Sequence, residues 1–173
     1  MAVRPILLLG NPALRTRCRR VRQGAHTAVG SVIADLRDTL AAFRNANGFG
    51  RGIAAPQIGC TERILYLEYE FSGPMINPVI ERRSRKKFML WDDCFSFPNL
   101  LVKVERAREV EVSFVDEHGR RKRLSASGGL SELLQHEIDH LDGILAIDRA
   151  IDTRHIILRS EFEKLQRETE LSL

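Results

Sequence analysis

The segment His136-Glu137-Ile138-Asp139-His140 lies in a stretch that we expect to fold as a helix with apolar residues on several sides. Residues four apart on an α-helix lie one turn apart on the same face, so His136 and His140 can bind one metal ion together. Glu137 is turned partly off that face and can reach a water molecule beside the metal. The pattern predicts a metal centre with an adjacent general base. The alternative is a solvent-exposed helix that carries two histidines by chance.

The same helix indicates the fold. It is expected to begin near residues 127–129 and to end at Gly143, and its apolar positions predict that it lies at the centre of the core. Amphipathic spacing predicts a second helix over residues 28–46, and Asp152 is a typical N-cap for a last helix. Alternating or β-branched runs predict strands at residues 64–67, 75–80 and 87–91 and a hairpin at 108–124, with Pro78 favouring an edge strand or a break.

Strands in a run followed by helices predict an α+β fold. We expect antiparallel or mixed β-sheets around the central helix, with one N-terminal and one C-terminal helix. The length of 173 residues and the lack of a repeat or linker predict one domain over residues 1–173. The apolar run at residues 6–9 is too short for a membrane span, so no membrane association is expected. Three widely spaced cysteines favour a reducing cytoplasm over a disulfide framework.

Basic residues concentrate in two runs, at residues 82–87 and 120–123, and the net charge is +4. Such runs can contact RNA, for example at a ribosome surface. The alternative is that they are solvated hairpins or edge strands.

A catalytic metal site needs a third protein ligand and one open position. Spacing alone does not choose among the remaining cysteines and histidines, which are Cys18, Cys60, Cys94, His26, His118 and His155.

Three segments resemble the signatures of the peptide deformylases, in the same order and at similar spacing. They are Gly50-Arg51-Gly52-Ile53-Ala54-Ala55-Pro56-Gln57, the segment around Cys94, and residues 135–143. Residues 10–15 are also similar to that family, and the resemblance covers roughly residues 5–160. A single motif would be weak evidence, whereas three in order are specific.

The resemblance implies that Cys94, His136 and His140 bind one divalent metal ion. It favours Fe²⁺ for activity, with Zn²⁺, Ni²⁺ or Co²⁺ as alternatives. Glu137 would be the general base and then the general acid. Gln57 and the backbone N–H of Phe95 would meet the oxyanion. The reaction implied is removal of the N-formyl group from the N-terminal methionine of new peptides, with release of formate.

The family pattern also implies a substrate site and a supporting ion pair. Asp92 and Arg106 would fix the cysteine loop. The substrate would bind in an extended form between two loops. The expected substrate-binding residues are Gly50, Arg51, Gly52, Ile53, Asp93, Gly129 and Leu133. Partners are an N-formylmethionyl peptide and, through the basic runs, the ribosome in transient contact, with no DNA.

The chain departs from the family where Asp92-Asp93-Cys94 replaces Glu-Gly-Cys and where Arg51 replaces a small apolar residue. The shorter acid predicts a weaker reach from Asp92 to Arg106. Arg51 and Asp93 are expected either to form a salt bridge across the cleft or to point to solvent. Two other functions follow from these changes: a related hydrolase with another formyl-amide substrate, and an inactive or weakly active metal-binding paralogue. Glu132 is expected near the side-chain pocket.

Overall fold

The computed structural model describes residues 2–22 and 29–170. In these ranges the chain forms three α-helices: α1 (Gly30–Asn47), α2 (Gly128–Leu141) and α3 (Arg159–Glu170). The strands are β1 (Gly52–Ala54), β2 (Ile64–Glu68), β3 (Ser72–Arg83), β4 (Lys87–Asp93), β5 (Leu100–Ala107), β6 (Glu109–Val115), β7 (Arg121–Ser127) and β8 (Ile156–Leu158). Short 3₁₀ helices include η3 (Ala55–Ile58) and η5 (Thr153–His155). The α+β prediction is confirmed.

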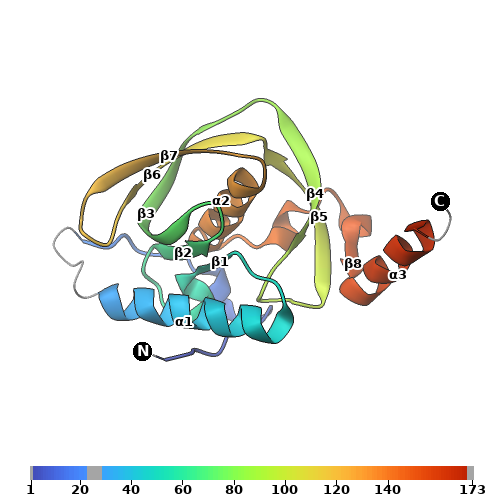
Figure 1. Ribbon diagram of the computed structural model, residues 1–173, viewed down its shortest axis with the longest axis horizontal. Helices are drawn as coiled ribbons and strands as arrows, with labels where there is room; N and C mark the ends of the chain where they lie inside the picture. Colours follow the sequence, from blue (N-terminus) through green and yellow to red (C-terminus); the bar gives the residue numbers. More distant parts are fainter. Residues whose placement is uncertain (1, 23–28, 171–173) are drawn as a thin grey trace.

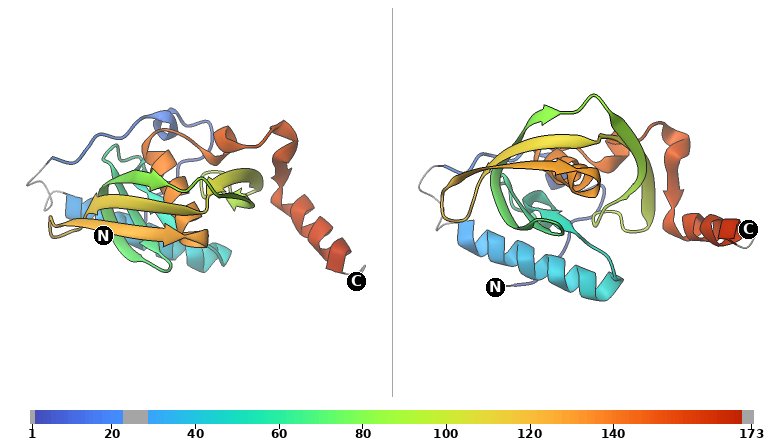
Figure 2. Two further views of the ribbon diagram at one scale, coloured as in Figure 1. Left: turned by 90° about the horizontal axis from the view of Figure 1, so that it is seen from above. Right: turned by 45° about the horizontal axis from the view of Figure 1, so that its top comes forward.

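The strands form two sheets with the orders β1-β2-β3-β6-β7 and β4-β5-β8, and every pairing between them is antiparallel. The sheets curve around α2, while α1 lies along one side and α3 projects away from the body (Figure 1). Two further views show the same arrangement, with the C-terminal end of α3 pointing away from the rest of the protein (Figure 2). None of the described helices combines the length and apolarity that a membrane span requires.

Helix α2 is the centre of the core, as its sequence predicts. Every residue from Leu130 to Leu141 is buried, and its apolar side chains pack against those of β2, β3 and β6. Burying each such side chain contributes about 1.5–3 kcal/mol. The helix ends at Leu141, Asp142 is its C-cap, and Gly143 follows with φ 75°. A Cβ at Gly143 would lie 2.5 Å from the carbonyl oxygen of Arg15, so the turn has room only for glycine.

The C-terminal helix begins later than its sequence indicates. Asp152 does act as an N-cap, accepting from the N–H of Arg154 at 2.8 Å, but the helix that it caps is the short η5. Strand β8 then pairs with β5, and α3 begins at Arg159. The expected helix start is wrong because the three apolar residues of β8 add a strand to the smaller sheet instead of following a helical face.

Pro78 marks a break but not an edge. Strand β3 lies between β2 and β6, and its register with β6 shifts between Ile76 and Val79. Asn77 in this irregularity has φ 54°, a conformation that asparagine tolerates. The glycine-rich segment from Gly48 to Gly59 contains β1 and η3, which bring its backbone against α2.

Candidate active site

Cys94, His136 and His140 meet in the core. Cys94 follows β4, and the two histidines come from successive turns of α2. The Sγ atom of Cys94 lies 3.2 Å from Nε2 of His140, which lies 3.1 Å from Nε2 of His136. All three residues are buried, and their potential ligand atoms lie within 4.8 Å of one another.

The other candidate ligands lie elsewhere. Cys18 packs in the core beside β2 and β3, and the thiol of Cys60 is hydrogen-bonded to Glu62 at 2.7 Å. His118 is exposed in the β6–β7 turn, and Nδ1 of His155 is hydrogen-bonded to Asp152 at 2.8 Å. His26 lies outside the described residues.

The donor set fits a divalent cation. His136 donates from Nδ1 to Asp92 at 3.0 Å, which leaves the lone pair of its Nε2 directed at Cys94 and His140. Two nitrogen atoms and one sulfur atom this close need a positive charge between them. Imidazole and thiolate ligands suit zinc, iron, nickel and cobalt alike.

Asp92 connects this cluster to a buried network of charges. Its carboxylate accepts from Arg106 at 3.1 Å, so the shorter acid still reaches the arginine expected for it. Arg106 also pairs with Asp139 at 2.5 Å, and Asp139 pairs with the more exposed Arg149 at 2.8 Å. Burial opposes ionisation of Asp92, but His136 and Arg106 outweigh it and lower the pKa of its carboxyl to about 2. Asp92 is therefore a permanently charged acceptor for His136.

Glu137 is packed without a hydrogen-bond partner for Oε2 among the described residues. Burial raises the pKa of its carboxyl to about 7, the range in which a carboxylate can both accept and return a proton. Strand β1 passes directly over it. A Cβ at Gly52 would lie 2.8 Å from Oε1 of Glu137, so the close approach of the strand depends on this glycine.

Gln57 and Phe95 both lie beside Cys94. The Oε1 atom of Gln57 accepts from the backbone N–H of Ala54 at 2.9 Å, which turns its amide group toward Sγ of Cys94 at 3.7 Å. The ring of Phe95 stacks on Phe43 of α1 with centroids 3.8 Å apart. The backbone N–H of Phe95 directly follows the cysteine, and the ring stacking fixes its loop.

A cavity of about 410 Å³ opens beside these residues. Its walls are the loop before β1, the segment around Cys94 and one face of α2. Five of the residues expected at a substrate site line it: Gly50, Arg51, Gly52, Asp93 and Leu133.

Ile53 and Gly129, the other two residues expected at a substrate site, do not line that cavity. Ile53 is fully buried on the opposite side of β1, against Leu36 and Leu40 of α1, because successive strand residues face opposite sides. Gly129 lies under Tyr69, whose hydroxyl would be 3.0 Å from a Cβ at that glycine.

Arg44 and Glu68 also line the cavity and were not anticipated. They form an ion pair at 2.9 Å, and Arg44 donates from Nε to the carbonyl of Gly50 at 3.1 Å. This arginine ties α1 to the glycine loop. Its position near the end of an amphipathic helix gives no sequence signal for such a role.

Neither arrangement expected for Arg51 and Asp93 is found, because both residues form ion pairs with other partners. Arg51 pairs with Glu132 at 2.7 Å, and Asp93 pairs with Arg159 of α3 at 2.8 Å. Glu132 has only 3% of its side chain exposed, so it needs a compensating charge far more than the partly exposed Asp93 does. Arg159 reaches Asp93 because α3 begins beside β5, where the guanidinium also lies 4.4 Å from the ring centroid of Phe49.

Comparison with known proteins identifies relatives of this arrangement. The family model described as "Polypeptide deformylase" matches residues 3–155. A peptide deformylase of Thermomicrobium roseum is 41% identical over 162 residues, which cover 88% of each chain. One from Pseudothermotoga lettingae is 34% identical over 97% of this chain and 95% of its own length. The crystal structure of the Thermotoga maritima peptide deformylase superposes with a TM-score of 0.81 at 27% identity, covering 88% of this chain and all of that one.

Proposed function

The chain belongs to the peptide deformylase family, and on that premise we propose how its residues divide the work of the reaction. The enzyme is a hydrolase that removes the N-formyl group from newly synthesised peptides, and the family depends on a metal ion. We assign the metal to Cys94, His136 and His140. The observation that supports this assignment is the convergence of one sulfur and two nitrogen atoms at 3.1–3.2 Å in a buried site.

We propose one Fe²⁺ ion per chain in the active enzyme, with Zn²⁺, Ni²⁺ or Co²⁺ able to replace it. When bound, the metal acts as a Lewis acid that polarises the formyl oxygen and makes water a better nucleophile. Asp92 orients His136 for this ligation through Nδ1, and Arg106 holds Asp92 in place.

The proton transfers belong to Glu137. Its carboxylate takes the proton of the attacking water and later delivers it to the leaving amine, so that formate and a free amino terminus are released. The amide of Gln57 and the N–H of Phe95 donate to the oxyanion that forms on the formyl oxygen. Removing one such donor typically reduces kcat by about 10²–10³. The substrate is an N-formylmethionyl peptide, held extended between residues 50–52 and 93–95.

Formate release tests this assignment. Protein loaded anaerobically with Fe²⁺ is expected to release formate from formyl-methionyl peptides with one metal ion per chain. Glu137→Ala should keep that metal content and lose turnover, whereas Cys94→Ala should lose both. Stoichiometric metal without any formate from the wild type would defeat the proposal and favour the weakly active or inactive metal-binding paralogue.

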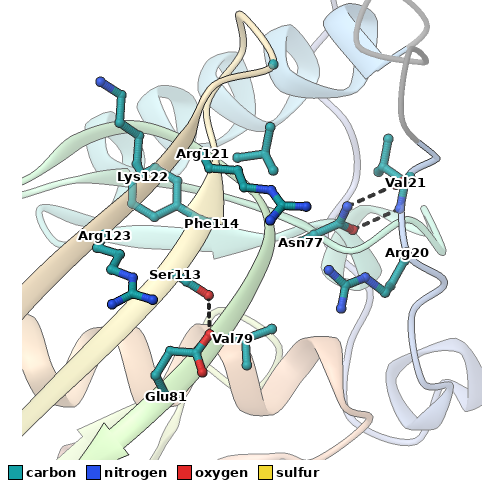
Figure 3. A pocket seen from close by; sticks show the side chains of 12 residues that line it. Arg20, Val21, Asn77, Val79, Glu81, Ser113, Phe114, Arg121, Lys122 and Arg123 are labelled. Atoms are coloured by element: carbon teal, nitrogen blue, oxygen red, sulfur yellow. Dashed lines mark hydrogen bonds between the residues drawn. The ribbon is translucent and has the colours of Figure 1, made fainter.

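A second proposal concerns the ribosome, through the basic runs at residues 82–87 and 120–123. Part of the second run lines a groove of about 800 Å³, whose walls include Arg20, Arg121, Lys122, Arg123 and also the acidic Glu81. Figure 3 shows the guanidinium groups of Arg20 and Arg121 approaching this groove from opposite sides. Convergent arginines of this kind suit a phosphate backbone. Strand β7 lies at the edge of its sheet, which fits the alternative that this run is a solvated edge strand as well as it fits RNA contact.

Co-sedimentation with ribosomes separates the two readings. Arg121→Glu with Arg123→Glu should abolish a salt-sensitive association, and Arg154→Glu, remote from both runs, should not. If both variants and the wild type sediment with ribosomes to the same extent, the groove does not bind the ribosome.

We infer a cytoplasmic location from the thiols. Cys18, Cys60 and Cys94 are all free, and Cys94 is needed as a thiolate ligand. A reducing compartment preserves them. Fractionation of the native host cells tests this location.

A further inference from the structure

One side chain from the C-terminal helix links two walls of the cavity. Arg159, the first residue of α3, donates from Nη2 to Oδ2 of Asp93 at 2.8 Å. Its guanidinium carbon also lies 4.4 Å from the ring centroid of Phe49. Asp93 belongs to the wall that carries Cys94, whereas Phe49 belongs to the loop before β1. Arg159 therefore contacts two separate walls of the cavity at once.

The same residue holds the loop that follows β4. Its Nε donates to the carbonyl of Pro98 at 2.9 Å, and its backbone N–H donates to the carbonyl of Asn99 at 2.8 Å. Together with the contact to Asp93, these bonds bind residues on both sides of Cys94. A loop that is fixed at both ends has fewer conformations available to it than a loop fixed at one end.

Arg159 is itself held in place. Strand β8, which directly precedes it, pairs with β5, as Figure 1 shows. Phe162 of α3 packs on Trp91 of β4 with ring centroids 5.4 Å apart. The planar guanidinium contacts two oxygen acceptors and an aromatic ring, which defines its orientation as an ammonium would not be defined. The side chain is thus fixed at its base and at its head.

The exposure of the ion pair favours a role in positioning over a role in stability. Of the side chains, 27% of Arg159 and 33% of Asp93 are exposed, and pairs this accessible contribute little to the free energy of unfolding. Both Asp93 and Phe49 line the cavity, however. Without Arg159 their side chains would be free to turn into the space between residues 50–52 and 93–95, where we place the peptide.

We propose that Arg159 is a positioning residue for the substrate, which sets the spacing between the loop before β1 and residues 93–99. This role rests on the proposed function of the cavity as the deformylation site. The groups that carry the reaction are held by other elements, since Glu137 is on α2 and Gln57 is on η3. Losing Arg159 should therefore raise KM and leave kcat nearly unchanged, the pattern of an interaction made equally in the bound substrate and in the transition state.

The test measures kcat and KM of the Fe²⁺-loaded wild type and of Arg159→Leu on a formyl-methionyl tripeptide, with kcat expressed per bound metal ion. KM should rise about 10-fold and kcat should stay within about 3-fold, because only misplacement of the reacting groups costs about 100-fold in rate. A merely structural role would lower the amount of folded, metal-bound enzyme and change neither value. An unchanged KM would overturn the positioning role, and so would a fall in kcat of about 100-fold.

Arg154→Leu is the matched control. Arg154 lies earlier in the same C-terminal segment, pairs with Asp152 at 2.9 Å and does not line the cavity. Its replacement should leave KM unchanged. A rise equal to that of Arg159→Leu would overturn the positioning role, because loss of any arginine from this segment would then have the same effect.

Asp93→Ala tests the same contact from the cavity side, without altering α3, and serves if Arg159→Leu does not fold. It should also raise KM. Combined with Arg159→Leu, it should raise KM no further than Arg159→Leu alone, because two residues that act through one contact have non-additive effects. An unchanged KM in Asp93→Ala, or a double variant whose KM reflects the product of both single effects, would overturn the positioning role.

The positioning role and the deformylase assignment fail in different ways. Formate release with the same KM in the wild type and in Arg159→Leu overturns the role of Arg159 and leaves the deformylase assignment standing. No formate from the wild type, with metal bound, overturns both together.

Discussion

Asp92 accepts the Nδ1 proton of His136 at 3.0 Å, from a position two residues before Cys94. One acid thus connects the two chain segments that meet at the metal site. Because the Nδ1 proton is held there, Nε2 of His136 presents a lone pair to the metal without having to lose a proton first.

Replacing this acid should weaken metal binding without removing a ligand. Asp92→Ala is expected to lower metal affinity by about 10–100-fold, the usual effect of losing a hydrogen-bond partner of a metal-bound histidine. Competition with a chromophoric chelator measures the affinity. Asp93→Ala is the control, because its carboxylate pairs with Arg159 and contacts no histidine ligand in the structure. Equal affinities of the two variants would contradict the role given to Asp92.

We expect Arg106 to contribute strongly to the free energy of unfolding. It lies between Asp92 and Asp139 with only 4% of its side chain exposed. Arg106→Leu leaves two buried carboxylates without their shared partner and is expected to reduce the free energy of unfolding by about 3–5 kcal/mol.

Chemical denaturation of the metal-loaded protein measures this loss. Arg149→Ala removes the other partner of Asp139, but that arginine has 45% of its side chain exposed, so it should cost no more than about 1 kcal/mol. Similar losses in both variants would show that burial does not set the contribution of Arg106.

The sequence predicts features that depend on neighbouring residues, but not those that depend on residues far away in the chain. Helix α2 and its two histidines follow from a local period, because four residues correspond to about one turn. Strand β5 was not predicted, since the buried Arg106 occupies a position where alternation would require an apolar residue. Its charge is balanced by acids 14 and 33 residues away in sequence.

The same limit applies at the cavity. Arg51 and Asp93 neither pair with each other nor point only to solvent, the two arrangements that the sequence left open. Their partners are 81 and 66 residues away, Glu132 on α2 and Arg159 on α3. Pairing of this kind depends on how helices pack on the sheets, which no local pattern encodes.

Gly52 should be needed for turnover more than for folding. A Cβ there would lie 2.8 Å from Oε1 of Glu137 and 2.7 Å from Cδ2 of Leu67, so Gly52→Ala must displace the side chain of Glu137 or the strand. We expect kcat to fall by about 100-fold, as for a misplaced catalytic group. The control is Gly30→Ala, where a Cβ meets nothing within 4 Å. Unchanged kcat in Gly52→Ala would contradict the placement of Glu137 as the base.

Cys18 and Cys60 should be poorly reactive thiols. Burial raises the pKa of Cys18 to about 11, and burial together with the hydrogen bond to Glu62 raises that of Cys60 to about 12. The thiolate is the reactive form, so alkylation near pH 8 should be roughly 100-fold slower for Cys18, and slower still for Cys60, than in the unfolded chain. Peptide mapping after iodoacetamide treatment resolves each cysteine, with protein in denaturant as the reference.

Because the pKa of both thiols is raised, the free energy of unfolding should fall as the pH rises. A thiol whose pKa is raised on folding stabilises the folded state fully below the unfolded value of 9.0 and loses that contribution as pH rises toward 11. The free energy of unfolding should therefore decrease between about pH 9 and 11. Cys18→Ala with Cys60→Ala should show a shallower decrease, because the unfolded chain no longer releases these two protons. If the free energy of unfolding of the wild type and of the double variant changes with pH in the same way, folding does not raise the pKa of these thiols.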